Sequence, residues 1–459
     1  MSTIETMHRT APTPAETDAH RASTNSQGAW PTAPTRTAFR YDLAVVGLGY
    51  VGLPTALAAF AAGLRVLALD VSPDRIAAVA ARRADLIDDD RLRLGLALGD
   101  PRFVMTVDAA HLRHAEHIVV CVPTPVDEHL VPDLTLLRAA CDTVAGLAVG
   151  GQTVMLTSTS YVGCTRDLLV APLERFGYEV GRDVFVAYSP ERIDPGNATV
   201  THDGVPRVVG GATPACVEHA VAMLGRTTDH VHPVSTLEAA EMTKILENTF
   251  RAVNIALANE FADICRGLDI AVVEVIDAAA TKPYGFMPFR PGPGVGGHCI
   301  PCDPHYLLWQ LHTSRVDAPM ITQAMTEIAA RPGRVAARVQ DVLSAAGRGI
   351  TDARIMVVGA SYKADVADVR ESPALEILET LAGRGAIVAY VDDHVPSVRL
   401  HDDRVLYSCD DPSGFGPHVV LLHTRHASMV LDWIPDDAIV LDATFDSAWA
   451  STADARLAV

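Results

Sequence analysis

Residues 41–52 read YDLAVVGLGYVG, an apolar run that leads directly into three glycines. Gly47, Gly49 and Gly52 have the GxGxxG spacing of a dinucleotide-binding turn between a strand and a helix. Gly47 permits a tight turn, Gly49 lets the backbone approach a pyrophosphate, and Gly52 allows close helix packing. The segment therefore predicts a nucleotide-binding α/β domain, with a purely structural glycine turn as the alternative.

The residues around this turn indicate which cofactor it binds. Tyr50 and Val51 lie at the predicted helix start, where free N–H groups favour a phosphate, and are expected cofactor contacts. The next apolar run, LRVLALD, ends at Asp70. Its carboxylate can accept hydrogen bonds from ribose hydroxyls and would repel a 2'-phosphate, so NAD is the predicted cofactor. Arg75 could bind such a phosphate, which keeps NADP open as an alternative.

Outward from the turn, apolar runs alternate with helical stretches. Such alternation predicts a parallel sheet covered by helices on both faces. After DLAVVG and LRVLALD, the further runs are HIVVCVP, QTVMLTST and DVFVAYS. Helical patterns follow from about residue 236 to 268 and from 304 to 346. Strand–helix alternation then restarts with RIMVVGA, AIVAYVD, HVVLLHT and AIVLDAT.

This pattern predicts an α/β protein built of three domains. We expect a disordered tail over residues 1–40, because its Thr, Ser, Ala and Pro composition offers no apolar period. A nucleotide-binding domain is expected at 41–230, a helical domain with the Cys299 loop at 231–345, and a second, smaller α/β domain at 346–459.

Composition narrows the partners. The 459 residues carry a formal net charge of -19 and a pI near 5.3, which would repel nucleic acid. We find no apolar stretch of 18 residues and no charged-then-apolar start, so neither membrane spanning nor secretion is predicted, and a cytoplasmic location is expected. Eight cysteines spread over so long a chain are unlike a disulfide framework and are expected to be mostly buried thiols.

Lysine is rare in this chain. Only Lys244, Lys282 and Lys363 are lysines among 37 basic residues, and arginine cannot replace a compact amine, so these three are candidates for chemistry. In the 236–268 helix Lys244, Asn248 and Arg251 share one face. A Lys and Asn pair can orient a hydroxyl and stabilise an alkoxide; a solvated polar face is the alternative.

The opposite face of the same helix is apolar. We expect this stripe, which a 3.6-residue period defines, to lie in the core. Its members are Leu246, Phe250, Val253 and Leu257.

The segment FRPGPGVGGHCIPCDPHYL at 289–307 is the densest in chemistry. Glycines such as Gly296 allow a substrate to approach the backbone, Cys299 can attack an aldehyde, and Asp303 can activate water against the resulting thioester. Arg290 is a candidate phosphate contact. The alternative is a zinc or disulfide site at His298, Cys299, Cys302 and His305, although no second ligand pair appears elsewhere.

Five motifs occur along the chain in this order: GLGYVG, PTP, SPERIDPGN, K-x-x-x-N and GVGGHCIPCDP. On these motifs the chain resembles the UDP-glucose/GDP-mannose dehydrogenase family from about Tyr41 to the end. The resemblance implies two Rossmann-like doubly wound domains joined by a central helical dimerisation domain. It also implies NAD, a UDP-sugar substrate, and a homodimer or higher homo-oligomer.

The resemblance also implies roles for individual residues. Thr124 in VPTP, which also contacts the cofactor, and Glu191 in YSPER, followed by Arg192 at the substrate, would be active-site groups. Lys244 and Asn248 would stabilise the oxyanion, Cys299 would be the nucleophile and Asp303 its acid/base partner. In YKADVADVRESPA, the residues assigned to phosphate or uridine recognition would be Lys363 and Arg370.

Within the family the motifs are most similar to the UDP-N-acetylglucosamine 6-dehydrogenase branch. Two departures flank the expected site: Thr157 begins a segment without the usual Glu and Pro, and Arg290 replaces an aromatic residue. UDP-glucose or another UDP-hexose thus stays open as substrate. A single-step 3-hydroxyacid-type dehydrogenase would not need Cys299, and an NAD-binding redox sensor would use Cys299 with Cys302.

Overall fold

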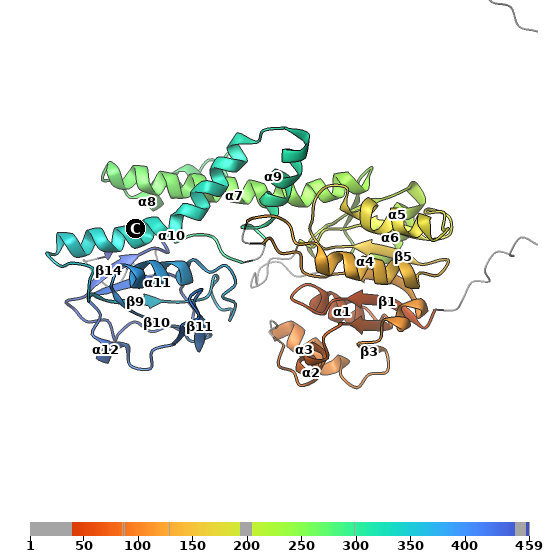
Figure 1. The fold of residues 1–459 in the computed structure, drawn as a ribbon, viewed down its shortest axis with the longest axis horizontal. Helices are drawn as coiled ribbons and strands as arrows, with labels where there is room; N and C mark the ends of the chain where they lie inside the picture. Colours follow the sequence, from red (N-terminus) through yellow and green to blue (C-terminus); the bar gives the residue numbers. More distant parts are fainter. Residues whose placement is uncertain are drawn as a thin grey trace, which may run out of the picture. The chain divides into compact units, whose positions relative to one another are not determined.

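The computed structural model describes residues 39–84, 86, 88–127, 129–192, 204–297, 299–445 and 456–458 (Figure 1). The predicted tail, apart from its last two residues, and His298 lie outside the described residues. Among the helices described, none combines the length and the apolar character that a membrane crossing requires.

An eight-stranded sheet carries the glycine turn. Its strand order is β3-β2-β1-β4-β5-β6-β7-β8, and the pairs are parallel except for β6 with β7. The first six strands follow the order of a doubly wound dinucleotide-binding fold. The strands are β1 (Tyr41–Val46), β2 (Val66–Leu69), β3 (Phe103–Thr106), β4 (Ala115–Val120), β5 (Thr153–Leu156), β6 (Phe185–Tyr188), β7 (Arg207–Gly211) and β8 (Val231–Pro233).

Alternating residues of these strands enter two cores, one on each face. On β1, Ala44 and Val46 join the core that contains α4, whereas Leu43 and Val45 join the core that contains α1. A buried parallel sheet needs such apolar residues on both faces. The helices here are α1 (Gly52–Ala61), α2 (Pro73–Ala80), α3 (Asp88–Ala97), η1 (Ala109–His114), α4 (Thr135–Leu147), η2 (Arg166–Val170), α5 (Ala171–Arg175) and α6 (Pro214–Leu224).

The middle of the chain is helical, as predicted. It contains α7 (Leu237–Gly267), α8 (Val272–Ala280), α9 (Asp303–Ser314) and α10 (Pro319–Ala345). The continuous helical pattern expected at 304–346 is in fact two helices. Arg315 ends α9 in the left-handed conformation with φ of 54°, and Pro319 starts α10, where its missing N–H costs no hydrogen bond.

The third part is a five-stranded parallel sheet of order β10-β9-β13-β14-β15. The two Rossmann-like sheets and the intervening helices confirm the predicted fold class. The strands are β9 (Arg354–Val358), β10 (Ile387–Val391), β13 (Val419–Leu422), β14 (Ile439–Asp442) and β15 (Arg456–Ala458); β11 (Ser397–Arg399) pairs antiparallel with β12 (Val405–Tyr407), and the helices are α11 (Pro373–Gly383) and α12 (Pro412–Phe415).

Hydrophobic cores link these three parts. Tyr306 of α9 and Leu237 of α7 belong to the core of the first sheet, whereas Val335 and Val339 of α10 belong to the core of the second. The predicted limit at 230 lies just before β8, the last strand of the first sheet, and the limit at 345 is the last residue of α10, which shares a core with the second sheet.

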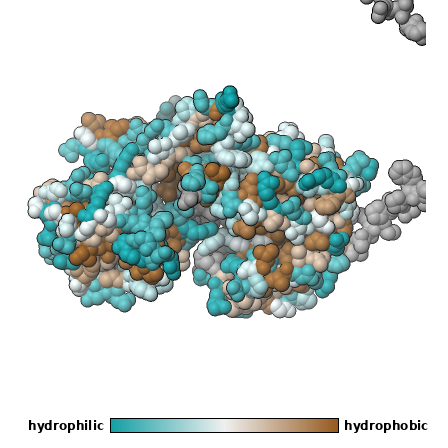
Figure 2. All heavy atoms as spheres, in the orientation of Figure 1, coloured by the Kyte–Doolittle hydropathy of each residue, from teal (hydrophilic) through white to brown (hydrophobic). Residues whose placement is uncertain are grey.

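The prediction that the apolar stripe of α7 lies in the core is wrong. Leu246 is 64% exposed, and Phe250 and Leu257 are each nearly half exposed, while Val253 is partly buried. The buried face instead carries Asn248, together with small residues such as Ala252 that let α10 approach closely. Apolar side chains also reach the surface over α8 and the adjoining end of α7 (Figure 2).

Candidate active site

The glycine turn has room for a ligand at one of its three glycines. Gly47 has φ of 91°, and a Cβ there would lie 2.5 Å from the carbonyl oxygen of Cys121. A Cβ on Gly52 would lie 1.8 Å from the carbonyl oxygen of Gly47. A Cβ on Gly49 would meet no protein atom within 4 Å, so the space beside Gly49 is open to a pyrophosphate.

The other predicted cofactor residues surround this turn. Asp70 is half-buried and accepts hydrogen bonds from the N–H groups of Leu48 at 2.8 Å and Ser72 at 2.9 Å. Arg75 donates through Nε to the carbonyl of Leu48 at 2.7 Å and so supports the turn itself. Tyr50 and Val51 are exposed at the start of α1. The open turn with an acidic residue beside it fits NAD.

The second sheet has a similar glycine turn, but the carboxylate beside it is not open to a cofactor. Gly359 has φ of 84°, but the corresponding carboxylate, Asp392, is buried and already accepts hydrogen bonds from four backbone N–H groups. His426 Nε2 lies 3.0 Å from the same carboxylate. Burial raises the pKa of Asp392, but the hydrogen bonds from His426 and the backbone outweigh burial and lower it. Asp392 therefore has little capacity left to accept hydrogen bonds from the hydroxyls of a ribose.

His426 also belongs to a group that could suggest a metal. Ligand atoms of Asp365, His394 and His426 lie within 4.8 Å of one another. However, His426 Nδ1 accepts from the N–H of Asp365 at 2.8 Å, and Nε2 faces Asp392. Both ring nitrogens are engaged, so this group does not fit a metal ion.

The loop after α8 brings the predicted nucleophile to α9. The carbonyl of Cys299 accepts from the N–H of Asp303 at 2.8 Å, at the start of that helix. Cys299 is exposed, whereas Cys302 is buried. Desolvation and the Asp303 carboxylate raise the pKa of Cys299, while Lys244 and Arg251 oppose the shift. The thiol is therefore protonated at rest and must lose its proton when it attacks.

Four of the predicted catalytic residues meet at this loop. Asn248 on α7 donates through Nδ2 to Asp303 on α9, and both side chains are buried. Burial raises the pKa of Asp303 to about 6, although Lys244 and the hydrogen bond from Asn248 act against the shift. Lys244, Asn248, Asp303 and Cys299 thus form one cluster, which we call the reacting cluster.

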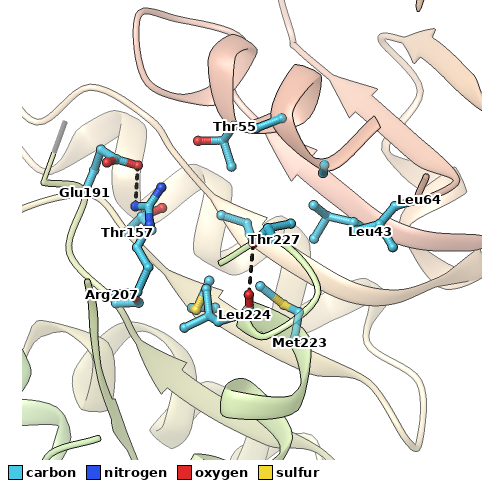
Figure 3. A pocket seen from close by; sticks show the side chains of 14 residues that line it. Leu43, Thr55, Leu64, Thr157, Glu191, Arg207, Met223, Leu224 and Thr227 are labelled. Carbon is cyan, nitrogen blue, oxygen red and sulfur yellow. Dashed lines mark hydrogen bonds and ion pairs between the residues drawn. The ribbon is translucent and has the colours of Figure 1, made fainter. Parts of the chain in front are cut away.

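Thr124 and Glu191 follow the carboxyl ends of β4 and β6, two strands of the first sheet that are separated by β5. Thr124, after β4, is buried, and its carbonyl accepts from the Tyr306 hydroxyl. Glu191 forms an ion pair of 2.7 Å with Arg207, and both side chains are largely buried (Figure 3). Both side chains of this pair line a cavity of about 40 Å³, and Thr157 lines it beside them.

Sequence reasoning missed Arg207. No local motif marks it, because its carboxylate partner lies sixteen residues away on the other side of the β6–β7 connection. Arg192, predicted to contact substrate, forms an ion pair with Glu247 of α7 at 2.7 Å and donates to the carbonyl of Pro206 at 2.8 Å.

The remaining predicted substrate residues are spread over two regions. Arg290 is exposed and pairs with Asp277 at 2.6 Å. At Gly296 a Cβ would lie 2.5 Å from the Cβ of Tyr362, so the nucleophile loop packs closely on the segment that contains Lys363. Arg370 forms a bidentate ion pair with Asp368, and its guanidinium carbon lies 4.3 Å from the centre of the Tyr50 ring.

Comparison with known proteins agrees with this arrangement. Three profiles of the UDP-glucose/GDP-mannose dehydrogenase family match the chain: the NAD-binding domain at residues 41–227, the central domain at 238–328 and the UDP-binding domain at 356–442. The first and third of these correspond to the two sheets, and the second to the helical middle.

Individual relatives cover most of the chain. Protein CapL of Staphylococcus aureus is 35% identical over 76% of this chain and 82% of its own length. The UDP-N-acetyl-D-glucosamine 6-dehydrogenase of Pseudomonas aeruginosa is 34% identical over 74% and 80%. Among solved structures, the UDP-D-ManNAc dehydrogenase of Pyrococcus horikoshii has a TM-score of 0.79 at 30% identity, covering 88% of this chain and 95% of that one. The chain therefore belongs to the UDP-glucose/GDP-mannose dehydrogenase family and is an NAD-dependent nucleotide-sugar dehydrogenase.

Proposed function

We propose that this protein oxidises the C6 alcohol of a UDP-N-acetylhexosamine to a carboxylate in two steps, through a thioester on Cys299. The observation that carries the proposal is the convergence of the reacting cluster from one loop and two helices. The relatives named for UDP-N-acetylglucosamine and UDP-N-acetylmannosamine support an N-acetylated sugar, with UDP-N-acetylglucosamine as the first choice.

The first oxidation needs an alcohol held and deprotonated. Lys244 and Asn248 donate hydrogen bonds to the C6 oxygen and stabilise the negative charge that develops on it. The open turn at Gly49 and Asp70 would hold NAD, which would supply the hydride acceptor for each of the two oxidations. Thr124 and Glu191 are proposed polar groups near the reacting carbon, with Glu191 held in place by Arg207.

The second oxidation takes place on the protein. The thiol of Cys299 adds to the aldehyde carbon, its proton leaves, and loss of a second hydride converts the adduct to a thioester. Asp303 then accepts a proton from water as the water attacks the thioester carbonyl, which releases the carboxylate and restores the thiol. In total one alcohol, one water and two NAD give one carboxylate, two NADH and three protons.

The nucleotide half of the substrate is assigned to the second sheet. The UDP-binding profile matches this part, and Lys363 and Arg370 lie in the segment that packs on the nucleophile loop. Arg290, exposed on the same loop, is a further proposed phosphate contact. We also propose that the exposed stripe of α7 forms a homodimer interface; the cytoplasmic location stays a prediction.

The test is a panel of UDP- and GDP-sugars, including UDP-glucose, assayed for NADH formation and sugar consumption. Two NADH per sugar are expected. One NADH per aldehyde released would support the single-step alternative.

Two cysteine variants separate the thioester from the zinc and redox alternatives. Cys299→Ser should stall turnover with accumulated enzyme–sugar ester, because an ester hydrolyses more slowly than a thioester. Cys302→Ser should retain most activity. Intact-protein mass spectrometry and metal analysis measure both; equal losses in the two variants with stoichiometric zinc would contradict the assignment of Cys299.

A further inference from the structure

Helix α9, which begins at Asp303, is built into the NAD-binding part of the protein. Tyr306 is fully buried in the same core as Leu137 of α4 and Tyr188 of β6. Trp309, three residues later, packs edge-on against Tyr161 with ring centres 5.8 Å apart. The helix that carries the acid/base residue thus shares a core with the cofactor sheet.

Two polar side chains of α9 bind backbone groups of that part. The Tyr306 hydroxyl donates to the carbonyl of Thr124, in the loop after β4. Gln310, one turn further along the same face, accepts from the N–H of Val162 at 3.0 Å and donates to its carbonyl at 2.8 Å. A two-point amide contact of this kind restricts both position and rotation.

Helix α7 is anchored to the loop that contains Val162. The buried carboxylate of Glu241 accepts from the N–H of Gly163 at 2.6 Å, and from the N–H and hydroxyl of Thr165 at 2.8 and 2.7 Å. Lys244 follows Glu241 by three residues and lies on the adjacent part of the helix face. Loop 161–165 therefore holds both helices that contribute to the reacting cluster.

We propose that Tyr306 and Gln310 are positioning residues that keep Cys299 aligned with the cofactor site while one NADH leaves and a second NAD enters. The inference rests on the proposed function. The turn of the first sheet is open to NAD, whereas Asp392 closes the corresponding turn of the second sheet. Two hydride transfers therefore need two NAD molecules that bind one after the other at the first turn. During the exchange the sugar is held by its bond to Cys299. The position of this adduct relative to the NAD site must be kept while NADH leaves and the second NAD binds.

The position of the adduct matters because thiol addition to an aldehyde is reversible. If α9 shifts while the cofactor site is empty, the second oxidation slows and the adduct reverts to free aldehyde and thiol. Loss of the contacts from α9 should therefore act on the second oxidation more than on the first.

The test compares Tyr306→Phe, Gln310→Leu and their double variant with two matched controls. Tyr407→Phe and Gln323→Leu make the same changes at exposed positions outside the proposed site. Sugar consumption, NADH and semicarbazide-trapped aldehyde are measured together. We expect the controls to give two NADH per sugar, and the double variant to fall toward one NADH with a matching amount of trapped aldehyde and a KM within about threefold.

A second measurement needs no cofactor or substrate. Iodoacetamide labelling of Cys299, located by peptide mass spectrometry, should change severalfold in rate in the double variant and stay unchanged in the controls. Circular dichroism and thermal melting check that the double variant is folded, as well as Tyr306→Phe, which removes one oxygen atom.

The outcomes separate the two hypotheses. If the wild-type protein makes one NADH per sugar, the proposed function fails. If the wild type makes two and the folded double variant also makes two without trapped aldehyde, the contacts from α9 are structural, even if kcat falls, and the inference is overturned.

Discussion

At the residue scale, Lys244 shows how the choice of cation matters. The chain uses arginine at nearly every basic position yet has lysine beside Asn248 and Asp303. A compact ammonium can share this space with a sugar oxygen, whereas a planar guanidinium is larger and spreads its charge over three nitrogens.

We predict that Lys244→Arg is nearly as damaging as Lys244→Ala, with kcat lower by about 10²- to 10³-fold in both variants, as expected for loss of an oxyanion donor. The charge is retained in the first variant, but its donors are misplaced. Steady-state kinetics measure the effect, and near-normal kcat in Lys244→Arg would reduce this residue to a general attractor of phosphate.

Asp303 leads to a prediction about pH. Its pKa is raised to about 6 by burial, so below that pH it is protonated and cannot accept a proton from water. Thioester hydrolysis should therefore speed up as pH rises through about 6 and then level off. Single-turnover release of the product from acyl-enzyme between pH 5 and 8 measures this; Asp303→Asn should remove the pH dependence and trap the acyl-enzyme.

The same shift has a consequence for stability. The folded-state pKa of Asp303 exceeds the unfolded value of 3.8, so the native state holds this proton more tightly, and the stabilisation is lost as pH rises through about 6. At pH 8 the free energy of unfolding of Asp303→Asn, measured by urea denaturation, should therefore exceed that of the wild type by up to about 3 kcal/mol at 1.36 kcal/mol per pKa unit, and by less at pH 5.

At the element scale, the two opposite faces of α7 differ in burial and in composition. Its buried face holds the reacting residues and small alanines against α10, and its exposed face holds large apolar side chains. Contiguous exposed apolar residues of this kind mark an interface between proteins.

We predict that the protein is a dimer through this face and that Leu246→Glu converts it to a monomer, because a carboxylate buried at the interface would have no partner. Leu92→Glu, at a similarly exposed leucine of α3, is the control and should leave the dimer intact. Size-exclusion chromatography with light scattering distinguishes the two; an unchanged dimer in both variants would place the interface elsewhere.

At the scale of the whole molecule, the first sheet matches the NAD-binding profile and the second sheet matches the UDP-binding profile, and α7, α9 and α10 link their cores. UDP alone, at 100 times its Kd, should raise the free energy of unfolding by about 2.7 kcal/mol and increase the melting temperature. Calorimetry with UDP and with GDP measures the effect; equal stabilisation by both would contradict the UDP preference.

Much of the fold followed from local patterns. Alternating apolar runs identified both sheets, because buried parallel strands need apolar residues on both faces. The bounds of α7 agreed within a residue, since Thr236 caps its first turn. The glycine spacing identified the nucleotide turn because Gly47 adopts a φ of 91°, which glycine accepts and other residues rarely do.

The sequence by itself thus determined the order of the elements, the nucleotide turn, and the shared helix face of Lys244 and Asn248. Tertiary structure alone decided that Asn248 on this face is buried while Leu246 is exposed, that Glu191 pairs with Arg207, and that α9 binds the loops after β4 and β5. The physical reason is distance along the chain. A periodic pattern defines the faces of an element, but its partners come from residues as far as 182 positions away, which only the packed fold brings into contact.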